Sequence, residues 1–225
     1  MSPVTREALD VVNNYMKQDC YQWKGPDKGN YSGETASWGL KNIDKWIAEL
    51  KPEIAVIMFG SNEVLLNEVK RHEKNLRALV QKCLDHGIVV ILNTIPPMHG
   101  HEEQVKKVVE MQRRVAEDMK VPLIDFYAHV INRRPDDWDG TLPQFAEFGR
   151  GDTPTLIGVD GIHLSYPEKW RNNYTAEGQR NNGYVLRTWL TLMAYAEVIN
   201  VVFHDQAPSV VSKDILGAHL PNFSN

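Results

Sequence analysis

The chain has 225 residues, enough for one sizeable α/β domain with its own hydrophobic core. Its formal net charge is −4 with histidine neutral, so it lacks the basic surface typical of nucleic-acid-binding proteins. No apolar run approaches the ~20 residues that a membrane-spanning helix needs, and no signal peptide is visible at Met1. Cys20 and Cys83 are the only cysteines, and they define neither a disulfide framework nor a metal site. We therefore expect no nucleic-acid partner and no membrane partner.

Hydrophobic periodicity predicts helices that alternate with short buried strands. The expected helices span residues 4–17, 35–50, 69–86, 102–119 and 184–203. The expected strands span residues 54–59, 88–93 and 121–126. The first of these is an unbroken apolar run, typical of a strand buried on both faces of a parallel sheet, and we take it as the central strand. This alternation predicts an α/β fold with helices on both faces of the sheet.

We expect a single domain over residues 1–203 and an irregular C-terminal tail over residues 204–225. We expect loops at residues 19–33 and 133–161, and loops as long as the second are often functional. The chain opens with a helix, whereas parallel α/β domains normally open with a strand. We therefore expect the domain to be N-terminally incomplete, with its first strand missing.

The sequence Gly60-Ser61-Asn62-Glu63 follows the apolar run that begins at Ile54. In open α/β sheets, ligands bind beyond the carboxyl ends of the strands, so Asn62 stands where a functional residue would be expected. The alternative is a turn capped by asparagine.

The sequence Asp160-Gly161-Ile162-His163 closes the long loop. A carboxylate three residues before a histidine can fix the imidazole tautomer and stabilise the imidazolium. His163 could then act as a general base toward a hydroxyl nucleophile. The alternative is a capping aspartate beside a surface histidine.

Three blocks stand in order along the chain: Tyr31-Ser32-Gly33-Glu34-Thr35, Gly60-Ser61-Asn62-Glu63 and Asp160-Gly161-Ile162-His163. This set resembles the SGNH, or GDSL-type, hydrolase superfamily. The resemblance implies a flavodoxin-like α/β/α three-layer sandwich and a serine esterase that uses no metal or other cofactor. It also implies that Gly33 and Asn62 donate to the oxyanion, and that Asp160 and His163 are two members of a Ser-His-Asp triad.

The Gly-Asp-Ser block that carries the nucleophile in this superfamily has no counterpart here, so the nucleophile is unknown. Ser2 is a candidate, although no strand precedes it. The simplest interpretation is that the chain begins downstream of the family's usual start. A secreted or periplasmic location would follow if a signal peptide was lost with that segment. Because a sheet without its first strand has an unpaired edge, we expect either a strand supplied by residues 210–220 or by a second chain, or else a protein of low stability.

His99, His101 and Trp138 are predicted to line the rim of a substrate site, although Trp138 could instead pin its loop to the body. The leading hypothesis is an esterase that deacetylates a carbohydrate or cleaves another small ester. The alternative is a non-catalytic carbohydrate-binding or interaction module on the same scaffold. A third hypothesis is a metal-dependent hydrolase that uses Asp160, His163 and the two histidines of the rim.

Overall fold

The computed structural model describes residues 1–16, 29, 31–209 and 215. The chain divides into two compact units. The first contains Met1–Tyr15, Pro96–Glu102 and Asp125–Ile215, and the second contains Met16–Ile95 and Glu103–Ile124. The single domain over residues 1–203 stays a prediction. Cys20 and almost all of the expected strand at residues 210–220 lie outside the described residues.

The second unit contains a three-stranded parallel sheet in the order β1-β2-β3. β1 spans Ile54–Ile57, β2 spans Val89–Asn93 and β3 spans Leu123–Ile124. The register pairs Ile54 with Val89, and Leu92 with Leu123. The predicted α/β class with a parallel sheet is therefore confirmed.

β1 differs from the prediction in length, position and burial. It ends at Ile57, and the next residues run on without strand pairing. Within the described residues β1 pairs only with β2, so β2 and not β1 is the central strand. Ile54 and Ile57 are buried, but Val56 is 41% exposed. The expectation of burial on both faces is wrong at Val56, because a strand paired on one side receives less cover from its neighbours.

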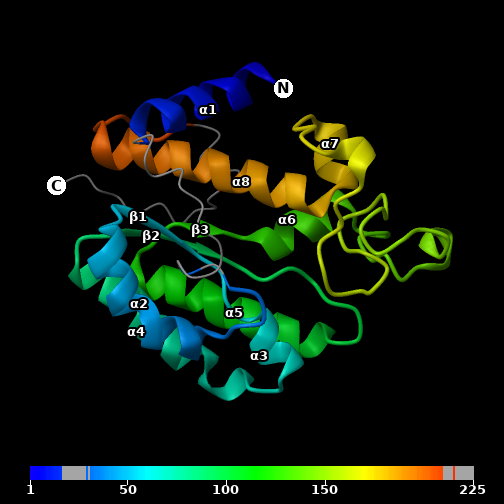
Figure 1. Cartoon of the computed structure of the whole chain (residues 1–225), viewed down its shortest axis with the longest axis horizontal. Helices are drawn as coiled ribbons and strands as arrows, with labels where there is room; N and C mark the ends of the chain where they lie inside the picture. Colours follow the sequence, from blue (N-terminus) through cyan, green and yellow to red (C-terminus); the bar gives the residue numbers. More distant parts are fainter. Residues whose placement is uncertain (17–28, 30, 210–214, 216–225) are drawn as a thin grey trace. The chain divides into compact units, whose positions relative to one another are not determined.

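Helices pack against this sheet within the second unit. α2 spans Ala36–Leu50 and lies beside α4, His72–Asp85 (Figure 1). The shorter α3 (Ser61–Leu65) and the 3₁₀ turn η3 (Val69–Arg71) connect β1 to α4. α5 spans Glu102–Met119 and belongs to this unit from Glu103 onward. The buried core joins side chains of α2, α4, α5 and the strands, including Ile43, Trp46, Leu76, Leu79, Val90, Leu92, Val115 and Leu123.

The first unit is mainly helical. α1 (Pro3–Tyr15) lies along α8 (Gly183–Val198), and α8 continues into the π-helical turn η6, Ile199–Phe203 (Figure 1). Trp189 Nε1 donates a hydrogen bond to Thr5 Oγ1 at 3.0 Å and so links the two helices. The remaining helical elements are α6 (Phe126–Arg133), η4 (Pro143–Phe145), η5 (Glu168–Trp170) and α7 (Ala176–Asn181). The six residues of α7 were not predicted, because they are too few to show a helical period.

The stretch Gly183–Phe203 is long and apolar enough to cross a membrane, judged by length and composition alone. It is the one such helix among the described residues. The expectation that no apolar run approaches this length is therefore wrong here. Half of its most apolar window is buried inside the protein, as in a core helix, so the finding is weak evidence for a membrane span.

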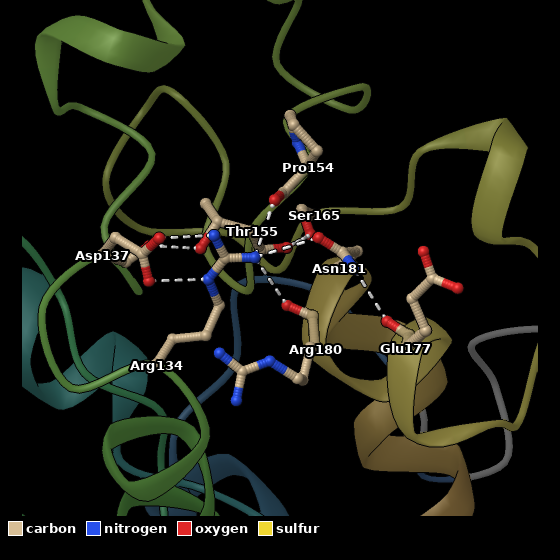
Figure 2. A network of polar contacts seen from close by, with 8 residues as sticks. All are labelled: Arg134, Asp137, Pro154, Thr155, Ser165, Glu177, Arg180 and Asn181. Atoms are coloured by element: carbon tan, nitrogen blue, oxygen red, sulfur yellow. Dashed lines mark hydrogen bonds and ion pairs between the residues drawn. The ribbon is translucent and has the colours of Figure 1, made fainter.

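Arg134 ties the start of the long loop after α6 to a later part of the same loop and to the end of α7 (Figure 2). Its guanidinium forms a two-pronged contact with Asp137, through Nε at 2.8 Å and Nη2 at 2.6 Å. Nη1 donates to the carbonyl oxygens of Pro154 and Arg180 and to Asn181 Oδ1, at 2.9, 3.0 and 3.0 Å. The planar fork of arginine suits such a set of oxygens, so one side chain connects two parts of the loop with the end of α7.

Candidate functional site

Asp160 and His163 form a hydrogen-bonded pair in the first unit. Asp160 Oδ2 lies 2.8 Å from His163 Nδ1. Asp160 Oδ1 accepts the backbone N–H groups of Ile162 and His163 at 3.0 and 2.9 Å. The aspartate thus closes a local turn, and it presents its second oxygen to the imidazole. His163 remains 55% exposed, so the ring is fixed at Nδ1 and open to solvent elsewhere.

The environment of Asp160 keeps it ionised. Burial alone would raise the pKa of this carboxyl group. The backbone N–H groups of His163 and Ile162, followed by the His163 side chain, oppose burial, and the net pKa lies below the ordinary value. Arg150 Nε also lies 2.6 Å from Asp160 Oδ2. An ionised carboxylate accepts hydrogen bonds only, so it places the proton of a neutral His163 on Nδ1 and leaves Nε2 as an acceptor.

The backbone around this pair is closely packed. His163 C=O accepts the N–H of Gly158 at 2.8 Å, and Ile157 bridges Leu164 in antiparallel fashion. Gly161 has a φ of +71°, and a Cβ there would lie 2.6 Å from His99 Cβ. Both the left-handed conformation and the close approach require glycine at this position.

Asn62 and the Gly33 block lie together in the second unit. Asn62 Nδ2 donates to the backbone carbonyl of Glu34 at 2.7 Å. Gly33 has a φ of +86° and nothing within 4 Å of its Cβ position, so the turn requires its conformation rather than its small size. Asn62 is the second residue of α3 and therefore follows β1 closely, as predicted. The two predicted oxyanion donors thus belong to segments that one hydrogen bond connects.

Glu63, the residue after Asn62, makes a second, buried connection between α3 and the start of α2. Its Oε1 accepts the N–H of Ala36, the first residue of α2, at 2.8 Å. The same oxygen lies 2.9 Å from Nδ1 of His72, which is completely buried. Burial would raise the pKa of Glu63, but the hydrogen bond and charge of His72 and the Ala36 N–H bring it below the ordinary value. Glu63 therefore has a structural role, since its carboxylate holds the start of α2.

Gln112 on α5 connects the segments that directly follow β1 and β2. Its Nε2 donates to the carbonyl of Phe59 at 2.6 Å, and its Oε1 accepts the N–H of Ile95 at 3.1 Å. Gly60 follows directly with a φ of +130°, and a Cβ there would lie 2.7 Å from Val108 Cγ1. The turn that leads into Asn62 is thus fixed by one buried amide and one close helix approach.

The three predicted rim residues lie in the first unit. His99 Nδ1 lies 2.7 Å from Asp139 Oδ2, and its side chain is 56% exposed. His101 is half-buried in the same turn. Trp138 is also half-buried, and its carbonyl accepts the N–H of Ile157, so its backbone helps to pin the long loop. A role for these residues at a substrate rim stays a prediction.

Ser2 caps the first helix. Its Oγ accepts the N–H of Thr5 at 3.2 Å and lies 2.8 Å from Thr5 Oγ1. This is the usual contact of a serine N-cap, which satisfies an otherwise unpaired donor in the first turn.

Within the described part of the chain, the His, Cys, Asp and Glu side chains form no cluster of three or more that could hold a metal ion.

Several contacts at these positions had no sequence signal or only a slight one. The pairing of Glu63 with His72, and of Asp139 with His99, joins residues that no motif connects. Gln112 could have been noticed, because it is a polar residue on the apolar stripe of α5.

Comparisons with known proteins place this chain in a family and a fold. Residues 8–167 match the GDSL-like Lipase/Acylhydrolase family. Esterase TesA of Pseudomonas aeruginosa is 27% identical over 135 residues, which are 59% of this chain and 57% of the relative. The chain therefore spans less than two thirds of the length of that curated relative.

Two solved structures are similar to this chain at low sequence identity. One is a catalytic mutant of Axe2, an acetylxylan esterase from Geobacillus stearothermophilus. Its sequence is 17% identical and its TM-score is 0.50, and the match covers 72% of this chain and 68% of that chain. A GDSL-like lipase from Bacteroides thetaiotaomicron is 18% identical with a TM-score of 0.48, covering 86% and 84%. The likeness to Axe2 supports the SGNH hydrolase fold. Because the family match extends over most of its length, the chain belongs to the GDSL-like Lipase/Acylhydrolase family.

Proposed function

We propose that this protein is an SGNH-type ester hydrolase that removes acetyl groups from a carbohydrate or cleaves another small ester. The observation that carries the proposal is the Asp160–His163 pair, with its 2.8 Å contact and its half-exposed imidazole. Membership of the acylhydrolase family supports the reaction class. The similar proteins named as an esterase and an acetylxylan esterase support the substrate class.

In the proposed reaction, a hydroxyl nucleophile attacks the ester carbonyl carbon and gives its proton to Nε2 of His163. The bond from the carbonyl carbon to the alcohol oxygen then breaks, and His163 returns the proton to the leaving alcohol. Water repeats both steps on the acyl-enzyme and releases the carboxylic acid. Asp160 stays ionised and stabilises the imidazolium that forms in each step. The resemblance implies a serine nucleophile, and Ser2 is the candidate that the sequence offers.

Because Asn62 and Gly33 match the family blocks, we assign them as hydrogen-bond donors to the oxyanion. One N–H of the Asn62 amide is used by Glu34, and within the described residues the other has no hydrogen-bond partner. Loss of one oxyanion donor typically lowers turnover by ~10²–10³. We therefore expect Asn62→Ala to lower kcat strongly while the protein stays folded; cooperative loss of folding would instead make Asn62 a structural turn residue.

Hydrolysis of 4-nitrophenyl acetate tests the proposal directly. His163→Ala should lower kcat by about 10²–10⁴, which is the usual contribution of a general base. His86→Ala is the matched control, because His86 is an exposed histidine at the end of α4 that the mechanism does not use. Turnover that survives in His163→Ala would refute the assignment.

One observation favours a second candidate, a carbohydrate-binding module without catalysis. Within the described residues, no serine hydroxyl is hydrogen-bonded to His163. Labelling with a fluorophosphonate probe, followed by peptide mapping, separates the two candidates. A labelled serine that requires His163 supports the esterase. Saturable binding of an acetylated xylo-oligosaccharide with neither labelling nor hydrolysis supports the binding module.

A further inference from the structure

The first unit contains a second carboxylate–imidazole pair, formed by Asp139 and His99. Asp139 Oδ2 lies 2.7 Å from His99 Nδ1, close to the 2.8 Å of the Asp160–His163 pair. The carboxylate is mostly buried, with 13% of its side chain exposed, while the imidazole is 56% exposed. The corresponding values for Asp160 and His163 are 27% and 55%. The two pairs therefore have similar contact distances and similarly exposed imidazoles.

Asp139 is itself held in place. Its Oδ1 accepts the N–H of Thr141 at 2.8 Å, and the Thr141 hydroxyl lies 3.1 Å from His99 Nδ1. An ionised carboxylate can only accept, so the proton of a neutral His99 belongs on Nδ1. Nε2 then carries a lone pair, and its orientation is set by the fixed Nδ1 contact. The exposed edge of His99 is thus a preorganised hydrogen-bond acceptor.

This pair contacts the loop that carries Asp160 and His163. The backbone N–H of His99 donates to the carbonyl of Gly161 at 2.8 Å. Gly161 lies between Asp160 and His163 in the sequence, and a Cβ on it would come within 2.6 Å of His99 Cβ and 2.9 Å of Thr141 Cγ2. The two carboxylate–imidazole pairs therefore start from backbone segments in direct contact.

A purely structural role accounts poorly for the side chain of His99. The backbone hydrogen bond to Gly161 already ties the two segments together without any imidazole. The imidazole itself leaves more than half of its surface to solvent.

We propose that Nε2 of His99 accepts a hydrogen bond from a free hydroxyl group on the alcohol part of the ester substrate. The substrate class is then a partial ester of a polyol or sugar, with a hydroxyl group next to the esterified oxygen. This inference rests on the proposed function for the reaction itself. It adds a substrate-binding role for His99 and a positioning role for Asp139, which fixes the tautomer.

Two esters of nearly equal size test the inference. 2-Hydroxyethyl acetate and propyl acetate differ only in a hydroxyl group in place of a methyl group. The wild-type protein should prefer the hydroxy ester in kcat/KM. His99→Phe keeps a ring but removes both nitrogens, and it should lower kcat/KM for the hydroxy ester by about 3- to 10-fold, the range of one hydrogen bond. Propyl acetate should change less than twofold.

Asp139→Asn should reduce the same preference, because an amide no longer forces the proton onto Nδ1 of His99. His86→Phe removes an exposed imidazole from α4 and serves as the matched control, with the preference unchanged. An equal loss on both esters in His99→Phe would overturn the inference, since His99 would then act through the loop. No loss on either ester would overturn it as well.

A binding measurement separates this inference from the proposed function. Methyl β-D-xylopyranoside carries neighbouring hydroxyl groups and no ester. Titration of the wild-type protein with it should shift the His99 ring signals in a ¹H–¹³C NMR spectrum, assigned by their absence in His99→Phe. If no ester is hydrolysed but this shift occurs, the proposed function fails and the hydroxyl site stands. If His99 signals stay unchanged at saturating xyloside and the ester preference is absent, the inference fails.

Discussion

Glu63→Ala should destabilise the second unit strongly. Glu63 is 3% exposed, and its carboxylate accepts two hydrogen bonds, from the Ala36 N–H at 2.8 Å and from His72 Nδ1 at 2.9 Å. The substitution leaves both groups buried without this acceptor, and each unsatisfied group costs about 1–3 kcal/mol. Together with the cavity left behind, we expect a loss of about 3–5 kcal/mol, the range observed when one partner of a buried pair is removed.

Urea denaturation followed by circular dichroism measures this loss, and thermal unfolding should show a Tm lower by about 6–20 °C. Glu103→Ala is the control, because Glu103 is exposed and its contact with Lys106 is a surface ion pair. A double-mutant cycle with His72→Ala should give a coupling energy above about 1 kcal/mol, as expected for residues in contact. A loss below 1 kcal/mol in Glu63→Ala, or no coupling, would refute the reasoning that this pair holds α2.

Four further outcomes follow from single residues. The pKa of Glu63 is below its ordinary 4.5, so its contribution to stability should be complete above pH 4.5 and should fall as the pH drops through the lower folded-state value; in Glu63→Gln this part of the pH dependence should vanish. Cys83 is fully buried and burial raises its pKa to about 11, so its peptide should stay unmodified by iodoacetamide at pH 8 until urea unfolds the chain. Gly60→Ala should cost about 1–3 kcal/mol from steric overlap, and clearly more than Gly87→Ala, where positive φ is the only penalty; equal losses in urea denaturation would contradict this. Arg134→Lys should speed amide exchange in residues 135–155, because an ammonium cannot make the two-pronged contact; exchange at the wild-type rate would show that the network does not hold the loop.

Local sequence patterns determined the parts of this protein whose contacts span a few residues. Asp160 and His163 are three positions apart, so the turn that joins them needs only the backbone N–H groups between them and a glycine at position 161. The alternation of apolar runs and amphipathic stretches likewise predicted the parallel α/β arrangement. The family blocks pointed to Gly33 and Asn62, and they lie in segments that a hydrogen bond connects.

Tertiary structure alone decided the pairings between distant positions. Asp139 contacts His99 at a sequence separation of 40 residues, and Gln112 contacts Phe59 at a separation of 53 residues. No sequence motif predicts either contact. The exposure of Val56 could not be read from its apolar run, because that exposure depends on which strands flank β1 rather than on the residues of β1. A sequence states which residues are neighbours along the chain, and so it determines turns, caps and the period of a helix or strand. The partners of buried carboxylates, amides and imidazoles are determined only when packing brings separate elements within hydrogen-bonding distance.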